Sequence, residues 1–348
     1  MNPYVLATLL SSLGLGTTLT FASSHWLLAW MGLEINTLAI VPLMAQHHHP
    51  RAVEATTKYF LTQATAAAVI LFASTANAWI TGEWSMTNMS DPIATAMILA
   101  ALSLKIGLAP MHFWYPEVMQ GLDLLTGLIL STWQKLAPLA LIIQAAQAFD
   151  PILLTSLGLM STLVGGWGGL NQTQLRKVLA YSSIAHMGWM VIVLQHALQL
   201  TFLALMTYIL MTSAAFLTLK LSYATKVGTL ATTWSKSPLL TATAALVLLS
   251  LGGLPPLTGF MPKWLILQEL AKQGLPLTAT MMALAALISL YFYLRLCYAM
   301  TLTISPNTSI STTPWRTQTT QVSVPLALST VMALGLLPIT PTVMALVT

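Results

Sequence analysis

Charged residues are scarce in this sequence. Asp, Glu, Lys and Arg make up only 6% of its 348 residues, whereas 56% are hydrophobic. Soluble domains contain about 25% charged residues, so a soluble globular fold is excluded. The 13 Lys and Arg residues are spread over many short segments, so they form no patch that would bind nucleic acid. The composition indicates an all-α polytopic membrane protein.

Cysteine and cofactor motifs are almost absent as well. Cys297 is the one cysteine, which excludes an internal disulfide and any Fe–S or zinc site built from several thiolates. The sequence has no glycine-rich dinucleotide motif, no Walker A motif and no paired histidines for haem. We therefore expect that whatever drives this protein is bound elsewhere. His47, His48 and His49 lie in one connection, where a metal site would need further ligands.

Long apolar runs are abundant. Runs long enough to cross about 30 Å of hydrocarbon predict about eleven transmembrane helices. The predicted spans are residues 3–22, 25–45, 57–80, 92–118, 122–147, 151–170, 176–195, 198–221, 238–272, 275–300 and 323–346. The longest predicted connections are residues 46–57, 81–91, 222–237 and 301–322.

Two of these runs, 92–118 and 238–272, are too long for a simple crossing and carry helix-breaking residues. Gly107 and Pro110 interrupt the first, and the second contains Pro255, Pro256, Gly259 and Pro262. Both runs are therefore predicted to be discontinuous helices, which many ion carriers use to build a central site.

The breaks occupy the fourth place in each half of the chain. Because each half has an odd number of spans, the halves would be inverted in the membrane. We expect one membrane domain over 1–348, made of a first repeat (1–147), a second inverted repeat (151–300) and a C-terminal helix (323–346).

Charged residues in the connections predict the orientation. One side would carry most bases: Arg51, Lys58, Arg176, Lys177, Lys220, Lys226, Lys236 and Arg316, with Arg295 nearby. The other side would carry Glu83, Asp91 and Asp150, with Lys272 as its base. The positive-inside rule then places the N-terminus on the cytoplasm-equivalent side, which is the matrix in a mitochondrion.

Ionisable residues also lie inside the predicted spans: Glu34, Lys105, Lys135 and Lys263. A charge at membrane depth is unfavourable by roughly 3 kcal/mol, so it is rarely present for stability. One acid cannot neutralise three bases, and a desolvated lysine can lose and regain its proton, which arginine cannot. A proton relay and buried ion pairs that only fix helix packing are both consistent with this pattern.

His112, beside the first break, and His186 are further candidates. Tyr181, Ser182 and Ser183 lie close to His186 in sequence and could hold water. A relay role and a purely hydrogen-bonded role are equally open for both histidines.

The motifs around these residues resemble a known family. They are KIGLAPMHFWYPEVMQG around Lys105, TWQKLAP around Lys135, LRKVLAYSSIAHMGW around His186 and GLPPLTGFMPKW around Lys263. They closely resemble the subunit 2 family of NADH:ubiquinone oxidoreductase (respiratory complex I) in its mitochondrially encoded form, which is related to the Mrp-type cation/proton antiporters.

The resemblance implies roles for the candidates. Glu34 and Lys105 would be the charge pair of a first half-channel, Lys135 the connecting residue, and Lys263 the residue of a second half-channel. His112 and His186 would lie on a hydrated central axis. Where many relatives have an acid at the last position, this chain has Lys263.

The resemblance also implies the complex, the membrane and the partners of the chain. The chain would be a proton-translocating subunit of NADH:ubiquinone reductase in the mitochondrial inner membrane, driven by quinone reduction elsewhere in the complex. FMN, Fe–S clusters and ubiquinone would be bound by other subunits, and neighbours would include antiporter-like and small membrane subunits and lipids such as cardiolipin. A stand-alone cation/proton antiporter and a purely structural membrane subunit are the alternatives.

Overall fold

The computed structural model describes residues 2–46, 49–235, 237–302 and 324–347. These residues form helices and two isolated β-bridges, and no β-strand occurs among them. The chain divides into two compact units, residues 1–161 and 162–348, and the division falls within one helix, α8. The all-helical prediction is therefore confirmed.

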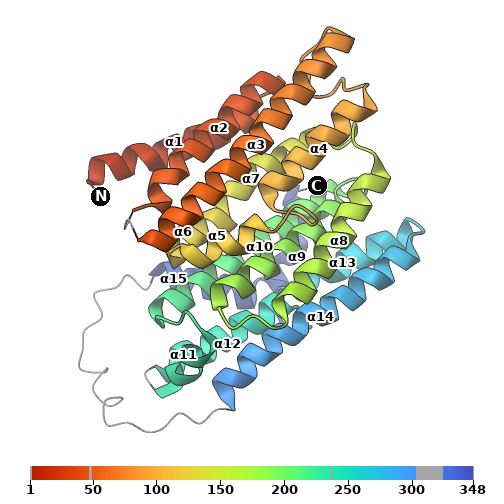
Figure 1. The fold of residues 1–348 in the computed structure, drawn as a ribbon. Helices are drawn as coiled ribbons and strands as arrows, with labels where there is room; N and C mark the ends of the chain where they lie inside the picture. The colour runs from red at the N-terminus through yellow and green to blue at the C-terminus, as the bar shows by residue number, and fades with distance from the viewer. Residues whose placement is uncertain (1, 47–48, 236, 303–323, 348) are drawn as a thin grey trace. The chain divides into compact units, whose positions relative to one another are not determined.

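The first unit begins with three long helices that pack side by side, α2 against both α1 and α3 (Figure 1). Its helices are α1 (Pro3–Ala22), α2 (Trp26–Met44), α3 (Pro50–Thr81), α4 (Pro92–Ile106), α5 (Trp114–Gly121), α6 (Leu124–Ser131), α7 (Trp133–Gln144) and the start of α8 (Pro151–Gly169). Polar residues begin several of them: the side chains of Asn2, His25, His49 and Asp91 accept hydrogen bonds from the first backbone N–H groups of α1 to α4.

Glycines let α1 and α2 approach closely. A Cβ atom on Gly16 would lie 2.8 Å from the Gly32 carbonyl oxygen, and one on Gly32 would lie 2.9 Å from the Gly16 carbonyl oxygen. Only glycine fits at this crossing, as is common where membrane helices pack. The crossing brings the Asn36 side chain of α2 against α1 at Gly16.

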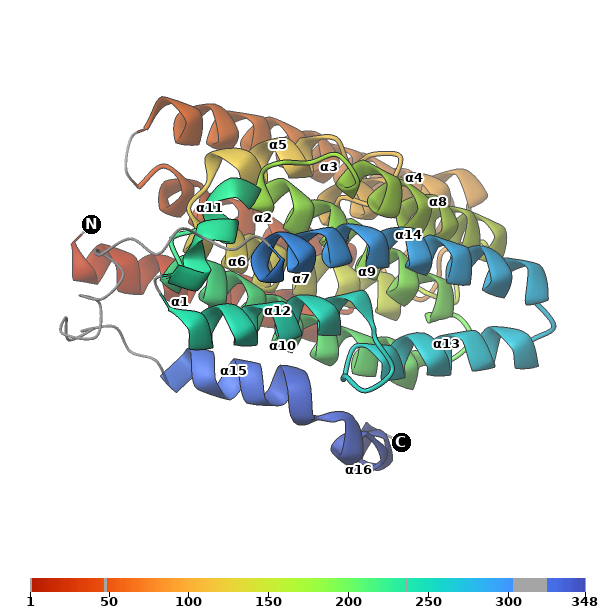
Figure 2. The ribbon, with the colours of Figure 1, turned by 90° about the horizontal axis from the view of Figure 1, so that it is seen from below.

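The second unit contains the rest of α8 and the remaining helices. They are α9 (Leu175–Val193), α10 (Leu198–Leu221), α11 (Val227–Ala231), η1 (Thr232–Ser235), α12 (Pro238–Gly252), α13 (Phe260–Lys272), α14 (Pro276–Thr301), α15 (Val324–Gly335), η4 (Leu337–Ile339) and α16 (Thr340–Val347). Helix α10 packs against α9, α12, α13 and α15, and α14 packs against α12 and α13. Figure 2 shows the loop that separates α12 from α13.

Both predicted discontinuous helices are present. The run 92–118 forms α4 and α5, and the run 238–272 forms α12 and α13. The first half-helix ends in each case at a glycine in the left-handed region, Gly107 at φ 83° and Gly253 at φ 82°. Only glycine adopts this conformation without strain, so these residues set where the helices break.

Some predicted boundaries were wrong. Helix α3 begins at Pro50, inside the predicted connection 46–57, because His49 caps it and Pro50 suits a first helical position. The predicted span 122–147 corresponds to one apolar stretch of membrane length, Leu124–Gln144, which is interrupted only at Thr132, between α6 and α7. The predicted helix 323–346 is divided after Gly335. The connection 222–237 contains α11 and η1.

Seven helices among the described residues are long and apolar enough to cross a membrane. They are Pro3–Ala22, Trp26–Met44, Pro50–Thr81, Leu124–Gln144, Pro151–Gly169, Leu198–Leu221 and Pro276–Thr301. Shorter apolar helices, including α4, α12 and α15, add to them. Most of the connection 301–322 lies outside the described residues, as do His47, His48, Lys236 and Arg316.

Candidate functional site: a lysine cavity at a helix break

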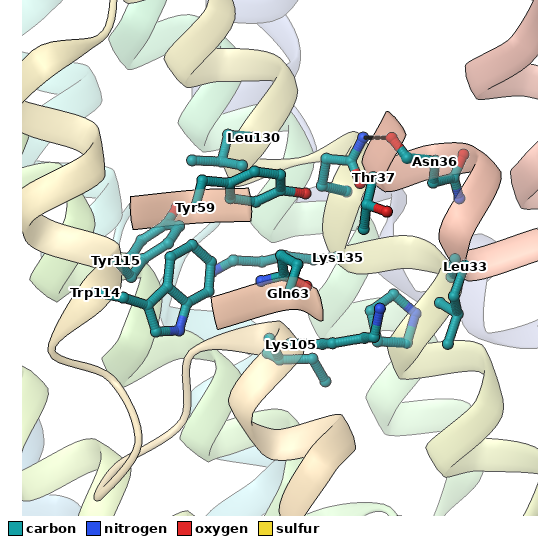
Figure 3. Close-up of a pocket in the computed structure, with 14 residues that line it drawn as sticks. Leu33, Asn36, Thr37, Tyr59, Gln63, Lys105, Trp114, Tyr115, Leu130 and Lys135 are labelled. Carbon is teal, nitrogen blue, oxygen red and sulfur yellow. Dashed lines mark hydrogen bonds between the residues drawn. The ribbon is translucent and has the colours of Figure 1, made fainter. Parts of the chain in front are cut away.

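A small cavity in the first unit is lined by two of the predicted lysines (Figure 3). Lys105 reaches it from α4 and Lys135 from α7. The other lining residues come from α2, α3, α5, α6, α7 and the end of α4: Leu33, Asn36, Thr37, Tyr59, Gln63, Ile106, Trp114, Tyr115, Leu130, Gln134, Ala137 and Pro138. The structure therefore brings together two cations that are 30 residues apart in the chain and places amide and hydroxyl groups around them.

Lys105 lies in the last turn of α4 and is only 6% exposed. Among the described residues its Nζ atom has no hydrogen-bond partner and no carboxylate oxygen within 4.0 Å. The carboxylate of Glu34, on α2, is near enough to interact with it electrostatically without direct contact. Glu34 is itself half-buried, and its Oε2 atom has no hydrogen-bond partner in the described part of the chain. Glu34 and Lys105 therefore make no direct ion pair in the described part of the chain, and their role as a charge pair stays a prediction.

Lys135 is the third residue of α7 and follows the break at Thr132. It is 2% exposed, and its Nζ atom lies 4.6 Å from the centre of the Tyr115 ring. Figure 3 shows its side chain extending toward that ring. The negative face of an aromatic ring stabilises a cation at this distance. Tyr115, on α5, therefore favours the charged form of Lys135.

The break between α4 and α5 is held by hydrogen bonds within the protein. The N–H groups of Gly107 and Leu108 both donate to the Ser103 carbonyl oxygen, at 2.9 Å. The indole N–H of Trp114 donates to the Leu104 carbonyl oxygen at 3.0 Å, and the Ala109 N–H donates to Ser161 Oγ at 3.1 Å. These bonds satisfy several of the backbone groups that the break frees, which is favourable at membrane depth.

The C-terminal end of α4 is also a favourable place for a cation. The aligned peptide dipoles leave partial negative charge at the end of a helix, and Lys105 lies one turn or less from it. Since Gly107 ends α4 inside an apolar run, the break creates this helix end at the cavity itself.

The cavity is small. The space open to the centre of a water molecule is about 10 Å³, which is close to the smallest that holds one water. The buried side-chain atoms Asn36 Oδ1 and Nδ2, Gln63 Nε2 and Lys105 Nζ have no hydrogen-bond partner among the described residues. Buried polar groups of this kind are usually satisfied by ordered water. The cavity is therefore large enough for about one water.

Lys263 belongs to the second unit, on α13 just after the other break. Its Nζ atom donates a hydrogen bond to the Gly252 carbonyl oxygen at 2.9 Å, and a Cβ atom on Gly253 would lie 2.9 Å from that Nζ. The ammonium group thus lies at the C-terminal end of α12, where the helix dipole favours positive charge. Both breaks carry a lysine at the end of the first half-helix, contributed by α4 itself in one case and by the second half-helix in the other.

The histidines lie apart from the cavity lining. His112 lies in the segment between α4 and α5, is 4% exposed and contacts the Phe113 ring at 4.4 Å between centres. His186, on α9 of the second unit, has Nδ1 2.7 Å from the Ser182 carbonyl oxygen and its ring 5.6 Å from that of Tyr208. Each is in a polar or aromatic setting suited to a histidine, and neither lines the lysine cavity.

Several lining residues were missed at the sequence level, above all Asn36, Gln63, Tyr59 and Trp114. The amides had a usable signal, because Asn36 and Gln63 lie within long apolar runs. The aromatic residues had none, since such residues are common in membrane helices.

Comparison with known proteins places the chain in a family. Residues 23–289 match the model of the transmembrane region of NADH:quinone oxidoreductases and Mrp antiporters, and residues 290–344 match the model of the NADH dehydrogenase subunit 2 C-terminus. NADH-ubiquinone oxidoreductase chain 2 of Carassius auratus is 83% identical over 348 residues, which is all of both chains. This chain belongs to the NADH-ubiquinone oxidoreductase chain 2 family.

Other matches agree with this assignment. Chain 2 of Danio rerio is 74% identical over the full length of both chains. A chain of respiratory complex I from Thermus thermophilus is similar at 29% identity with a TM-score of 0.86, over 99% of this chain and 80% of that one. The Mrp complex from Dietzia sp. shares the fold, with a TM-score of 0.86 at 15% identity over 97% of this chain and 76% of that one.

Membership in the chain 2 family confirms the resemblance inferred from the lysine motifs. The chain is a multi-pass membrane protein of the antiporter-like family and a subunit type of NADH-ubiquinone oxidoreductase.

Proposed function

We propose that this chain moves protons across the membrane as an antiporter-like subunit of respiratory complex I. Lys105 and Lys135 exchange a proton at the cavity of the first unit, and Lys263 takes the corresponding role in the second. The observation that carries the proposal is that two buried lysines face one cavity and that Lys105 is held there without a carboxylate in contact.

Electrostatics supports an exchange between Lys105 and Lys135. Two ammonium groups on a cavity of about 10 Å³ repel each other, so the cavity holds one proton more favourably than two. The α4 C-terminus stabilises the charge on Lys105, and the Tyr115 ring stabilises it on Lys135. The two positions are therefore alternative sites for one positive charge, and about one water would carry the proton between them.

Glu34 is the modulator in this proposal. Its carboxylate interacts with Lys105 at a distance, so a closer approach would favour the charged form of Lys105 and a retreat would release the proton. Quinone reduction elsewhere in the complex would change that distance through a neighbouring subunit. His112 and His186 would hold water near the path.

The architecture proposed for the chain follows the sequence reading. It has about eleven spans, arranged as the inverted repeats 1–147 and 151–300 with a C-terminal helix at 323–346. The repeat is supported by the matching breaks at Gly107 and Gly253. The basic residues of the connections place the N-terminus on the matrix side of the mitochondrial inner membrane and the C-terminus on the intermembrane-space side.

The proposed partners and lipids are those expected for a membrane subunit of complex I. We expect other membrane subunits of complex I, antiporter-like and small ones, as partners, together with lipids such as cardiolipin. FMN, Fe–S clusters and ubiquinone would be carried by other subunits, so this chain would contribute proton transfer and no redox chemistry.

A native gel of mildly solubilised membranes tests the setting. The chain should run with the large band that stains for NADH dehydrogenase activity. If it runs alone or as a small oligomer without that activity, a stand-alone cation/proton antiporter becomes the better assignment. If Lys105→Met and Lys263→Met alter only the amount of that band and leave pumping by the assembled complex unchanged, the lysines have a structural role.

A further inference from the structure

Two consecutive layers of contacts join α3 to α5 beside the lysine cavity. In the inner layer the Tyr59 and Trp114 rings lie 5.7 Å apart, and both line the cavity (Figure 3). In the outer layer the Lys58 ammonium lies 2.8 Å from a carboxylate oxygen of Glu117. Lys58 precedes Tyr59 on α3, and Glu117 lies one turn after Trp114 on α5, so each outer residue is fixed to an inner one.

The ion pairs of the outer layer lie at a solvent-exposed end of the first unit. The side chains of Lys58, Glu54 and Glu117 are 42%, 63% and 54% exposed, and such charges do not face hydrocarbon. Helix α3 has 32 residues and is roughly 48 Å long, well beyond the thickness of the hydrocarbon core. Its charged N-terminal part therefore lies at or beyond the membrane–water interface.

The cavity lies a short distance below that end. Gln63, which lines it, is five residues after Lys58 on α3, about 7.5 Å along the helix axis. Between the two stand Tyr59, which is 2% exposed, and Trp114, which is 8% exposed. The ring pair thus lines the cavity next to the exposed charged residues of α3 and α5.

Helix α5 packs most closely against α3 at its C-terminal end. Its last residue, Gly121, is in such close contact with α3 that a Cβ atom there would lie 2.5 Å from the Arg51 carbonyl oxygen. Its first residue, Trp114, follows the non-helical segment of the break. A tilt of α5 about Gly121 would therefore displace Trp114 most.

Two contacts oppose this tilt: the hydrogen bond from the Trp114 indole N–H to the Leu104 carbonyl oxygen, and the ion pair of Lys58 with Glu117. The ion pair is the weaker kind of contact. Lys58 also binds Glu54, at 2.8 Å, so its ammonium group is shared between two exposed carboxylates. Exposed ion pairs contribute little to stability and are screened by salt. The cluster of Lys58, Glu54 and Glu117 therefore adds little to the stability of the fold. Its ion pair between α3 and α5 can break readily.

We propose that the Tyr59–Trp114 ring pair is a water gate to the lysine cavity and that Lys58 is the positioning residue that holds the gate closed through Glu117. The inference rests on the proposed function, because a gate to this cavity controls when its lysines exchange protons with water. Opening would admit a continuous file of water, and closing would isolate the bound proton.

The test is hydroxyl-radical labelling of Trp114 in the purified whole complex, read by mass spectrometry. Lys58→Met removes the ammonium group and keeps the apolar stem, and labelling of Trp114 should rise several-fold. The matched control is Lys272→Met, which removes a similarly exposed lysine from a surface pair with Glu269. Equal labelling of Trp114 in the Lys58→Met complex and in the wild type overturns the gate.

Further variants test the gate if the complex that carries Lys58→Met fails to assemble. Glu117→Gln should raise Trp114 labelling as Lys58→Met does, and Lys58→Arg should leave it low. Raising the salt concentration should increase labelling of Trp114 in the wild type, while Trp26, which is 1% exposed, stays unlabelled. Labelling that is insensitive to both Glu117→Gln and salt would also overturn the gate.

Pumping and Trp114 labelling together distinguish an error in the gate from an error in the proposed proton relay. If Lys105→Met leaves pumping unchanged while Lys58→Met raises Trp114 labelling, the relay fails and the rings still control water entry. If Lys105→Met lowers pumping while labelling does not respond to Lys58, the relay stands and the gate is wrong.

Discussion

Lys263 Nζ donates a hydrogen bond to the Gly252 carbonyl oxygen, 2.9 Å away, and so links the two halves of the second discontinuous helix. Lysine is the right residue for this place, since its ammonium group is attracted to the C-terminal end of α12 and can still give up a proton. An arginine would satisfy the same carbonyl but would hold its charge permanently.

Lys263→Met should therefore reduce the number of protons pumped per NADH, because the second unit loses its proton-binding group. The loss of the ammonium at the helix end is worth about 1 kcal/mol, so the complex should still assemble. Proton uptake and NADH oxidation measured together in proteoliposomes give the ratio. Lys263→Arg should be equally impaired, and normal pumping by that variant would mean that proton release from Lys263 is not required.

Gly253→Ala should destabilise the second break. At φ 82° a non-glycine residue is strained by about 1–2 kcal/mol, and the added Cβ would press on Lys263 Nζ. The thermal inactivation temperature of the complex should fall. Gly14→Ala is the control, because a Cβ on that helical glycine meets nothing within 4 Å, and equal effects of the two variants would count against the strain.

Tyr115→Leu should lower pumping through Lys135. The ring contributes about 0.5–2 kcal/mol to the charged form of that lysine, which leucine cannot supply. Tyr115→Phe retains the ring face and should pump almost normally. The comparison is made on proton yield per NADH at equal complex content, and a Phe variant as defective as the Leu variant would assign the effect to the hydroxyl group.

The helix breaks and the four intramembrane charges could be predicted from sequence because each has a local cause. Gly107 and Gly253 are needed where the chain adopts a positive φ, and a lysine in an apolar run is conspicuous by itself. The interruption at Thr132 was missed because its nearest signal, Pro138 inside α7, lies six residues later and does not specify the residue at which the helix is interrupted. The start of α3 at Pro50 had a signal, a proline at the first helical position, but a hydropathy run does not report it.

Pairings between distant residues could not be predicted. That Lys135 shares a cavity with Lys105 depends on how α4 and α7 pack, and the Tyr115 ring reaches Lys135 only because the first break redirects α5. Nor does the sequence indicate that Lys263 bonds to the end of its own preceding half-helix. Such contacts arise from tertiary packing and leave no periodic trace in the chain.

In the proposed relay the lysines of the cavity carry the transported proton. The most direct measurement is the ratio of protons pumped to NADH oxidised by proteoliposomes containing the Lys105→Met complex, with the Lys272→Met complex as the surface-lysine control. Methionine keeps the apolar volume of the buried stem, so the complex should assemble and oxidise NADH. We expect a ratio below that of the wild type for Lys105→Met and a normal ratio for Lys272→Met. A normal ratio in an intact Lys105→Met complex would contradict the proposed relay.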